Sequence, residues 1–269
     1  MLIGLPALLT FGLAFFHYDA LSLPVWSGIE NFVSIFNERV FHIASWNSLL
    51  FVGIAVPMRM IGAVALALLL QERRRGTGTY RAAVFLPTIV PDVAYAFIWL
   101  WIFNPLYGPL NLLLGAFGMK GAAWLVSTET ALGSIVFMSI FQLGEGFVLM
   151  LAALRQIPRE YYEAARLDGA SSVNCFTAIT LPLIAPWLLL LFARDVVITL
   201  QSSFTAAYLM TGGGPYYATL LMPVLIYEEG FDRFRFGLAS AMMLTVFVVI
   251  GFLLLLTQRV MRKWLHEAT

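Results

Sequence analysis

Five charged residues interrupt long apolar runs, and ionisable groups in such surroundings are the chain's first candidates for chemistry. They are Arg59, Asp92, Glu145, Arg194 and Asp195. Each charge would cost several kcal/mol if it faced lipid, so we expect these side chains to face the interior of a helix bundle or a wet cavity. Two interpretations stay open: the residues pair and lock helices together, for example Arg59 with Glu145, or some of them line a path for a polar solute.

Two polar stripes follow helical spacing in consecutive apolar runs, which places the members of each stripe on one helix face. One stripe has the spacing i, i+3, i+7 and contains Ser139, Gln142 and Gly146, with Glu145 beside it. The other has the spacing i, i+4, i+7 and contains Asp195, Thr199 and Ser202. Such stripes can hydrogen-bond a polyhydroxylated solute; the rival interpretation is that Ser, Thr and Gln join neighbouring helices in lipid.

A polar segment between two apolar runs, residues 155–182, carries strong local structural signals. Pro158 suits the first position of a helix, where a missing N–H costs nothing, and Glu160 then lies in the first turn, where the helix dipole favours a negative charge. Gly169 suits the left-handed C′ position that ends a helix, and Ser171 can cap a second short helix. The segment is predicted to be a helix, a glycine turn and a helix, although an ordinary capped loop shows the same signals.

The spacing of small and acidic residues in this segment adds a more specific pattern. Glu163-Ala164-Ala165 is followed after three residues by Gly169, and after nine more by Ile179-x-Leu181-Pro182. This pattern resembles the EAA loop of permease subunits of binding-protein-dependent ABC importers. Three further stretches look like the maltose-transporter type of sugar permease within that family, and they are residues 28–32, 103–108 and 208–215.

The resemblance implies a coupling role for the segment. In that family a short helix, here residues 160–167, docks in a surface cleft of an ATPase subunit, and closure of the ATPase dimer drives alternating access. By resemblance, Glu163 contacts the ATPase, the small Ala164 and Ala165 allow close approach, and Gly169 sets the angle between the two loop helices. The candidate coupling residues are Glu160, Glu163, Ala164, Ala165, Asp168, Gly169, Ile179, Leu181 and Pro182.

The resemblance also implies partners and a class of solute. The expected assembly contains a second homologous permease as heterodimer partner, two P-loop ATPase subunits, an extracytoplasmic solute-binding protein and the lipid bilayer. ATP and Mg would be bound by the ATPase subunits, and this chain would hold no cofactor. The expected solute is a sugar or oligosaccharide; the alternative is glycerol-3-phosphate or a related phosphodiester, for which Arg59 and Arg194 would be available.

One stretch departs from the sugar-permease pattern and leaves the solute open. Before Thr-Gly-Gly-Gly-Pro that family commonly reads Phe-Gln-Ala-Phe-Asp, whereas this chain reads Gln201-Ser202-Ser203-Phe204-Thr205. Phe204 keeps the aromatic position, and Thr205 replaces the acidic one. Phe204 and Tyr208 join the charged residues and the polar stripes as candidates for the substrate path.

The composition supports a membrane protein and excludes several other classes. Hydrophobic residues make up 61% of the 269 residues and charged residues 12%, against about 25% charged in a soluble domain. The net charge of +1 does not indicate a nucleic-acid partner, and the single cysteine, Cys175, excludes an intrachain disulfide. The sequence contains no P-loop, no His/Cys/Glu cluster with metal spacing and no nucleophile–base pair, so we expect neither an enzyme nor a metal site.

Six apolar runs approach the roughly 20 residues that a membrane helix needs. They are residues 2–16, 47–70, 83–103, 130–154, 183–200 and 237–260. Together with the resemblance, they predict one all-α domain over residues 1–269, a six-helix transmembrane bundle of the type I ABC importer permease kind. The first run lacks a basic n-region and a small-x-small cleavage site, so an uncleaved span is favoured over a signal peptide. Kinks are expected at Pro57, Pro87 and Pro91.

Basic residues in the loops predict the orientation. One side carries Arg73, Arg74, Arg75, Arg81, Arg155, Arg159, Arg166, Arg259, Arg262 and Lys263, and the other carries Arg39, Lys120, Arg233 and Arg235. The richer side is expected to be the cytoplasm, with both termini and the 155–182 segment on it, in a multi-pass protein of a prokaryotic inner membrane. On the outer side, residues 219–231 are expected to form a short amphipathic helix at the membrane interface.

A rival interpretation from another class is an ion-coupled secondary transporter, in which Asp92, Glu145 and Asp195 relay a proton or an ion. Such carriers often show inverted repeats, and the sequence shows no clear internal repeat. Dependence of transport on ATP or on an ion gradient separates the two classes.

Overall fold

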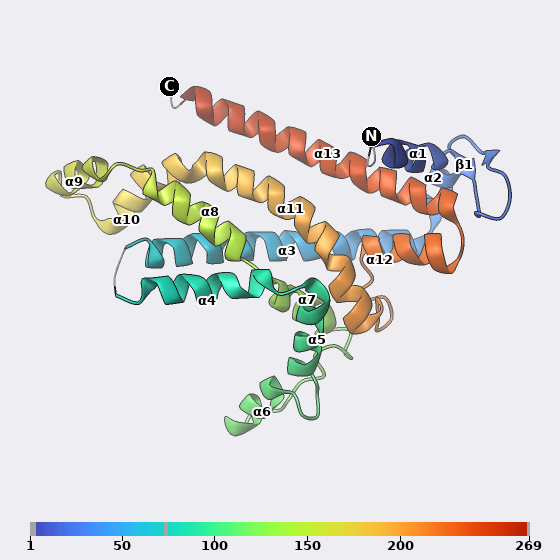
Figure 1. The fold of residues 1–269 in the computed structure, drawn as a ribbon, viewed down its shortest axis with the longest axis horizontal. Helices are drawn as coiled ribbons and strands as arrows, with labels where there is room; N and C mark the ends of the chain where they lie inside the picture. Colours follow the sequence, from blue (N-terminus) through green and yellow to red (C-terminus); the bar gives the residue numbers. More distant parts are fainter. Residues whose placement is uncertain (1–3, 73–74, 268–269) are drawn as a thin grey trace. The chain divides into compact units, whose positions relative to one another are not determined.

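The computed structural model describes residues 4–72 and 75–267, with side chains to residue 259. Its regular structure is almost entirely helical (Figure 1). The first elements are α1 (Gly4–Leu13), β1 (Phe16–His17), β2 (Val25–Trp26), α2 (Glu30–Asn37), α3 (Arg39–Leu70), α4 (Thr77–Ile89), α5 (Asp92–Ile102) and α6 (Pro109–Ala116). The remaining elements are α7 (Ala131–Ile140), α8 (Gly144–Arg155), α9 (Arg159–Leu167), α10 (Ser172–Cys175), the π-helical turn η1 (Phe176–Thr180), α11 (Leu181–Thr211), α12 (Met222–Tyr227), the π-helical turn η2 (Glu228–Asp232) and α13 (Phe236–Glu267). Leu2, Ile3, Arg73 and Arg74, which enter the predicted first span and the orientation, lie outside the described residues.

Three described helices are long and apolar enough to cross a membrane: α3, the continuous helix Ser172–Thr211 and the Phe236–Arg259 part of α13. If each of two bent pairs, α4 with α5 and α7 with α8, crosses as one span, the described residues hold up to five. The run expected at 2–16 contains α1, whose 10 residues are about half the length that a lipid core requires. A helical membrane protein with several apolar spans is confirmed, and the count of six spans stays a prediction.

Proline explains the sharper of the two breaks. α4 and α5 meet at 101°, and between them Val90 is extended at φ −67° and ψ 128°, the conformation that a following proline favours. Pro91 then removes a backbone donor, and Asp92 begins the next helix. The kink expected at Pro91 is confirmed, whereas Pro57 and Pro87 each lie within a helix that continues past them.

The break between α7 and α8 interrupts a run that the sequence predicts as one helix over residues 130–154. The two helices meet at 43°, and Gly144 opens α8 against α4. A Cβ on Gly144 would lie 2.3 Å from Thr88 Oγ1 and 3.0 Å from the Cα of Phe85, so only glycine allows this approach. The Gly144 N–H donates to Thr88 Oγ1 at 3.1 Å, which fixes the start of α8 on α4.

The chain divides into two compact units, each assembled from separate stretches of sequence. The first unit comprises Met1–Val52, Asp92–Ile135 and Thr199–Leu253, and the second comprises Gly53–Pro91, Val136–Ile198 and Leu254–Thr269. The 155–182 segment and four of the five charged candidates belong to the second unit. A single transmembrane domain over residues 1–269 stays a prediction.

In the first unit, the stretch between the first two predicted spans is structured. β1 and β2 pair antiparallel with Phe16 opposite Trp26. The buried Asn31 side chain donates to the carbonyls of Ala14 and Phe16, both at 2.9 Å, and so holds α2 against the hairpin. α3 already begins at Arg39, before the predicted start of its span at residue 47.

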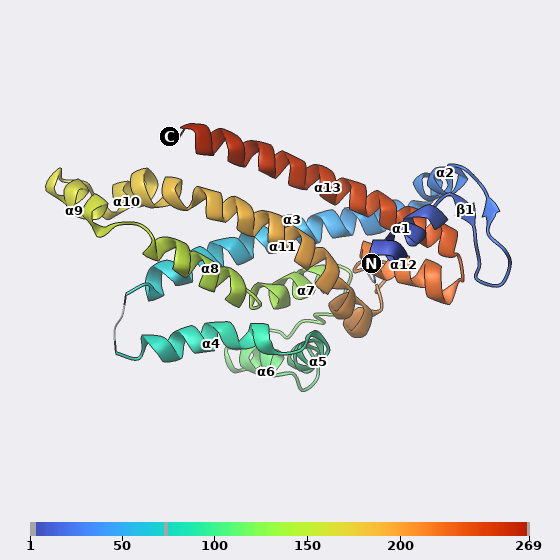
Figure 2. The same cartoon turned by 45° about the horizontal axis from the view of Figure 1, so that its top comes forward.

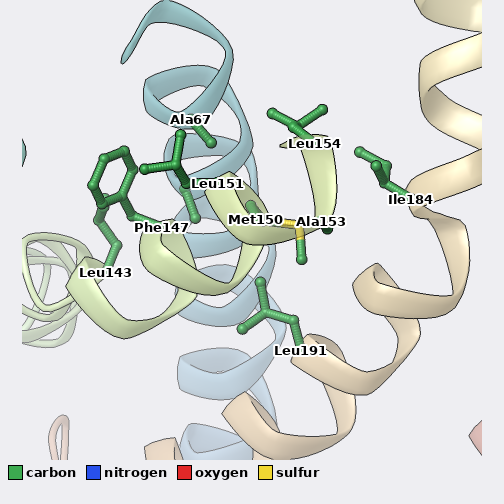
Figure 3. Packing of buried hydrophobic residues seen from close by; sticks show 10 residues of the cluster. Ala67, Leu143, Phe147, Met150, Leu151, Ala153, Leu154, Ile184 and Leu191 are labelled. Carbon is green, nitrogen blue, oxygen red and sulfur yellow. The ribbon is translucent and has the colours of Figure 1, made fainter. Parts of the chain in front are cut away.

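In the second unit, α8 is the central helix of the hydrophobic core. Figure 3 shows Phe147 and Met150 on α8, Ala67 on α3, and Ile184 and Leu191 on α11. Burying a large apolar side chain contributes about 1.5–3 kcal/mol, so the cluster fixes α8 relative to the adjoining parts of α3 and α11. The 155–182 segment begins at the carboxyl end of α8, and it is therefore attached directly to this core.

Candidate functional site

The first helix of the 155–182 segment, α9, projects from its unit. Pro158 has φ −60° and ψ 138°, so it directly precedes the first helical residue instead of occupying that position as predicted. Glu160 in the first turn and Arg166 in the last turn both match the sign of the helix dipole. No residue of α9 is buried, and the helix lies beyond the end of α8 in both views (Figures 1 and 2).

Backbone hydrogen bonds, rather than packing, fix the turn after α9. Gly169 has φ +83°, and a Cβ there would meet nothing within 4 Å. The Ala170 N–H donates to the Ala165 carbonyl at 2.9 Å, and the Gly169 N–H donates to the Arg166 carbonyl at 3.1 Å; this pair of bonds defines a Schellman motif. The left-handed turn predicted at Gly169 is confirmed. The positive φ, and not crowding by neighbouring atoms, is the reason why this position requires glycine.

The second helix of the segment runs without interruption into a predicted membrane span. The Ser171 hydroxyl accepts from the Asn174 N–H at 3.3 Å and caps α10 as predicted. η1 then joins α10 to α11, so Ser172–Thr211 is one helix of 40 residues. Pro182, which directly precedes the span predicted at residues 183–200, lies in the first turn of α11. It has no N–H for the carbonyl of Ala178, and the wider π turn accommodates its ring.

A side-chain hydrogen bond ties α9 to the base of that long helix. The hydroxyls of Tyr162 and Thr180 lie 2.9 Å apart, and Thr180 is buried. Thr180 is the unspecified position between Ile179 and Leu181, so the motif itself does not point to it. Since the bond joins the two ends of the segment, α9 is held to α11 as well as to α8.

α9 presents two different faces. Tyr161, Ala164 and Leu167 lie on the outward face, where the tyrosine is 53% and the leucine 89% exposed. The opposite face carries Arg159, Tyr162, Glu163 and Arg166, which line a cleft of about 1150 Å³. Their spacing of i, i+3, i+4 and i+7 places them together on the helix. We call this space the α9 cleft; its other walls are the ends of α3 and α8 and the stretch from α10 to η1.

Four of the five charged candidates form one network across three helices of the second unit. Asp195 on α11 has its Oδ2 at 3.8 Å from Arg59 Nε on α3, and its Oδ1 accepts from Arg194 Nη1 at 2.7 Å. Arg194 also contacts the carboxylate of Glu145 on α8. These observed pairs, Arg59 with Asp195 and Arg194 with Glu145, differ from the pair given as the example from sequence.

The charge network extends from the core of the unit to its surface. Arg59 and Asp195 are buried, whereas the side chain of Glu145 is 51% exposed. Removing one member of a buried ion pair costs about 3–5 kcal/mol because the other charge stays behind, so Arg59 and Asp195 lock α3 to α11. Among the described residues, no group of three or more His, Cys, Asp or Glu side chains is placed to hold a metal ion.

The first polar stripe serves mainly structural contacts. The Ser139 hydroxyl donates to a carbonyl of its own helix at 2.7 Å. A Cβ on Gly146 would lie 3.2 Å from a methyl group of Leu191, so this glycine allows close packing of α8 on α11. Gln142 lies in the break between α7 and α8, and its main-chain carbonyl, not its side chain, accepts from Arg59 Nη2 at 3.0 Å. Of the stripe, the structure therefore brings only Gln142 and the neighbouring Glu145 into the charge network.

The remaining polar candidates belong to the first unit. Asp92 begins α5 and is exposed at the break after Pro91. Thr199 is buried and Ser202 half-buried in the part of α11 that belongs to this unit. Asp92 therefore belongs to a different unit from the four charges of the network.

An aromatic group accompanies the other two candidates. Phe204 and Tyr208 stack with ring centroids 5.2 Å apart and an interplanar angle of 14°. Tyr227 lies 5.1 Å from Tyr208 and 5.2 Å from Phe231. The sequence predicts the first two residues and misses Tyr227 and Phe231, although their i, i+4 spacing was a usable signal.

The Gly-rich stretch after α11 forms a tight turn in the first unit. Gly212 and Gly213 have φ +57° and +78°. The Thr219 hydroxyl lies 2.6 Å from the Thr211 hydroxyl and donates to the Gly214 carbonyl at 2.6 Å. This network explains the run of glycines as a turn requirement.

The helix that follows this turn is buried, which corrects the amphipathic interfacial helix predicted for residues 219–231. Met222 of α12 is buried, and Glu229 of η2 is 0% exposed. The Glu229 carboxylate contacts Arg233 and lies 3.5 Å from Arg235. Glu229, a charged residue of this stretch, is therefore buried and paired instead of facing water. Its partners, Arg233 and Arg235, lie beyond the predicted helix.

Comparison with known proteins gives a consistent picture. Residues 60–266 match the family described as binding-protein-dependent transport system inner membrane component. The chain is 33% identical over 264 residues to the probable ABC transporter permease protein YesP of Bacillus subtilis, covering 94% of this chain and 83% of that protein. It is 31% identical over 249 residues to the trehalose/maltose transport system permease protein MalF of Thermococcus litoralis, covering 91% and 83%.

Another relative and a solved structure complete the comparison. The sn-glycerol-3-phosphate transport system permease protein UgpA of Salmonella typhimurium is 31% identical over 227 residues, covering 83% of this chain and 76% of that protein. A chain of a bacterial alginate ABC transporter, solved in complex with alginate pentasaccharide-bound periplasmic protein, has a TM-score of 0.83 at 24% identity, covering 97% and 89%. At that identity the structural likeness supports the fold.

Proposed function

The chain belongs to the family of inner-membrane permeases of binding-protein-dependent ABC importers, and from this premise we propose that it carries a sugar or oligosaccharide. It is a multi-pass protein of the inner membrane and is not itself an enzyme. It works in a complex with a periplasmic binding protein and with ATPase subunits, which hydrolyse the ATP.

The observation that carries the coupling proposal is α9, a helix that has no buried residue and yet is fixed at both ends. The core around α8 holds its start, the Tyr162–Thr180 hydrogen bond joins its first half to η1, and the Schellman turn fixes its end. The outward face, with Tyr161, Ala164 and Leu167, docks on the ATPase. Closure of the ATPase dimer then moves α8 and the adjoining part of α11 as rigid levers and drives alternating access.

Glu163 supplies the charged contact of this interface. It lines the α9 cleft at the border with the outward face, next to Leu167, where it is exposed, and its side chain forms no hydrogen bond or ion pair with another described residue. Ala164 and Ala165 have small side chains, which allow the ATPase to approach closely. Asp168, the C-cap residue of α9, and Gly169 together set the angle between α9 and α10. A carboxylate that has no partner among the described side chains is available to a basic group of the ATPase.

The charge network favours an uncharged solute over a phosphodiester, provided that it borders the solute path. Arg59 and Arg194, the arginines that a phosphate would need, already face Asp195 and Glu145. A neutral polyol can hydrogen-bond to the exposed Glu145 end, whereas an anion would have to break an ion pair. The relatives named above include permeases for both kinds of solute, and the balanced charges support the sugar.

The pairing of the carboxylates also supports an importer over an ion-coupled carrier. An ion or proton relay needs carboxylates that are open to the path, whereas Asp195 and Glu145 each contact an arginine of their own unit. A second homologous permease completes the path as a heterodimer partner. The side that carries α9, Arg155 and Arg259 faces the cytoplasm, in keeping with the positive-inside rule.

Purification in mild detergent from native membranes tests the importer and the docking role together. The tagged chain, Glu163→Lys and a control Glu129→Lys are compared by mass spectrometry of copurifying proteins, with Glu129 chosen because it is an exposed carboxylate in the other unit. The tagged chain and the control should retain an ATPase and a second permease, and Glu163→Lys should lose the ATPase while staying in the membrane. Solute uptake should fall at least about tenfold, within the usual range of coupling energies. An ATPase that stays bound to Glu163→Lys would contradict the docking role.

Transport in proteoliposomes tests the solute and the energy source. The assembled complex and its binding protein are supplied with ATP or with an ion gradient, and maltose-type sugars compete with glycerol-3-phosphate. ATP-dependent uptake inhibited by the sugar supports the proposal. Uptake driven by the gradient alone would instead establish the secondary transporter, and inhibition by glycerol-3-phosphate only would establish the phosphodiester.

A further inference from the structure

The described residues that line the α9 cleft carry a net positive charge. Arg155, Arg159 and Arg166 line it together with Glu72 and Glu163, three positive charges against two negative ones. None of the three guanidinium groups forms a hydrogen bond or an ion pair with another described residue. Arginine guanidinium groups bind phosphate strongly, because their donors match its oxygens in pairs.

The floor of the same cleft is apolar. Leu68 near the end of α3, Leu154 near the end of α8 and Phe176 at the start of η1 line it. All three lie where an apolar, membrane-type helix meets the polar 155–182 segment. A volume of about 1150 Å³ exceeds the usual range of about 300–1,000 Å³ for small-molecule sites, so one small anion would leave most of the cleft unfilled.

A ligand that satisfies both surfaces needs an anionic head and an apolar tail. We propose that the α9 cleft binds an anionic phospholipid of the surrounding bilayer, with its phosphate on Arg159 and Arg166 and an acyl chain along Leu68 and Leu154. Basic pockets between membrane helices bind anionic lipid headgroups on the same physical grounds. The inference needs only the inner-membrane location of the chain and does not depend on the docking role of α9.

A lipid in the α9 cleft would pack against the cleft face of α9. The cleft face of α9 is opposite to Tyr161, Ala164 and Leu167, so a bound lipid leaves the outward face free. It would fill the space between α9 and the ends of α3 and α8, where the only side-chain link from α9 that the structure describes is the Tyr162–Thr180 hydrogen bond.

Native mass spectrometry of the purified full chain tests this site without any partner protein. Delipidated chain in detergent is titrated with phosphatidylglycerol or phosphatidylcholine, and bound lipids are counted. The variant Arg159→Gln/Arg166→Gln is compared with Arg75→Gln/Arg259→Gln, which removes the same charge from exposed positions outside the cleft. The original chain and the control should bind phosphatidylglycerol more tightly than phosphatidylcholine. In the cleft variant the ratio of the two affinities should fall about thirtyfold, because each arginine contributes about fivefold.

Three results would overturn the site. An equal loss in the control variant means that general surface charge attracts the lipid. An equal affinity for both lipids removes the role of the arginines. Displacement of phosphatidylglycerol by millimolar inorganic phosphate means that the cleft takes a soluble anion. Arg159→Lys/Arg166→Lys keeps the charge and should retain the preference, which separates loss of binding from misfolding. Retention of the ATPase is measured separately, so failure here leaves the proposed function untouched.

Discussion

Two segments of this chain are built from the same local parts and are used in opposite ways. In residues 158–180, α9 ends in a left-handed glycine turn, and α10 and the π turn η1 follow. In residues 212–232, a left-handed glycine turn is followed by α12 and the π turn η2. No residue of α9 is buried, whereas α12 and η2 bury Met222, Leu225 and Glu229.

The difference shows that the residues of a glycine turn do not determine whether the helix next to it is buried or exposed. Backbone caps determine both turns, but the charges are satisfied differently. Glu229 is paired with arginines of its own unit, whereas the side chains of Glu163 and Arg166 have no partner among the described residues. The buried segment anchors its unit, and the exposed one leaves these two charged side chains accessible. Five predictions can break or sharpen this contrast.

The largest effect is expected from removing the partners of the buried carboxylate. Arg233→Met/Arg235→Met leaves Glu229 charged and 0% exposed, and should lower the free energy of unfolding by about 3 kcal/mol, the lower end for a broken buried pair because the arginines are half exposed. Arg159→Met/Arg166→Met on α9 should change it by less than about 0.5 kcal/mol. Equilibrium unfolding in detergent measures both, and similar losses would erase the distinction between anchor and free helix.

The two glycine turns should differ in their tolerance of alanine. At Gly213 a Cβ would lie 3.0 Å from a methyl group of Leu220 and 3.5 Å from its Cα, whereas at Gly169 it would meet nothing within 4 Å. Gly169→Ala should therefore cost about 1 kcal/mol from positive φ alone, and Gly213→Ala about 2 kcal/mol from strain and crowding together.

Gly169→Val extends this test from stability to coupling. A β-branched residue resists positive φ, so the turn should change shape and solute-stimulated ATPase activity of the assembled complex should be lost. Normal stimulation in this variant would show that the angle after α9 does not matter for coupling.

A smaller effect is expected at the link between α9 and α11. Tyr162→Phe removes the hydrogen bond to Thr180 and should lower the free energy of unfolding by about 1 kcal/mol. Thr180→Val should cost at least as much, because Thr180 is buried. The double variant should cost less than the sum of the two single variants, and simple additivity would mean that the bond does not hold α9.

The smallest effect concerns pH. Burial raises the pKa of Glu228, next to the buried carboxylate, above its ordinary value of 4.5, with Arg233 opposing the shift. A raised pKa means that the folded chain binds this proton more readily than the unfolded chain, so the contribution to stability is present at low pH and is lost as pH rises through the folded-state pKa. Glu228→Gln should therefore reduce the change of the free energy of unfolding with pH around that folded-state pKa, while Glu163→Gln should not. Equilibrium unfolding at a series of pH values measures both.

Features that depend on neighbouring residues were predictable from the sequence. The glycine turn at Gly169 and the cap at Ser171 follow from backbone chemistry within a few positions, and both are confirmed. The helical membrane class follows from composition, and the break at Pro91 from the missing N–H. The roles of the coupling residues, of the substrate path and of the orientation remain proposals.

Features that depend on distant residues were not predictable. The break before Gly144 requires Thr88, 56 residues away, and no local signal marks it. The partner of Arg59 proves to be Asp195 because α3 and α11 meet in space. The burial of Glu229 depends on how η2 is covered by its unit, which periodicity cannot distinguish from a helix lying on a membrane surface.

The exposed apolar face of α9 also bears on how the complex is made in the cell. A leucine that is 89% exposed beside a half-exposed tyrosine is the kind of surface that chaperones and proteases recognise in incomplete proteins. Docking of the ATPase would hide it, so the helix can report whether assembly has finished. A newly synthesised chain without its ATPase should have a shorter half-life in pulse–chase labelling than the assembled one, and Leu167→Ser should lengthen it.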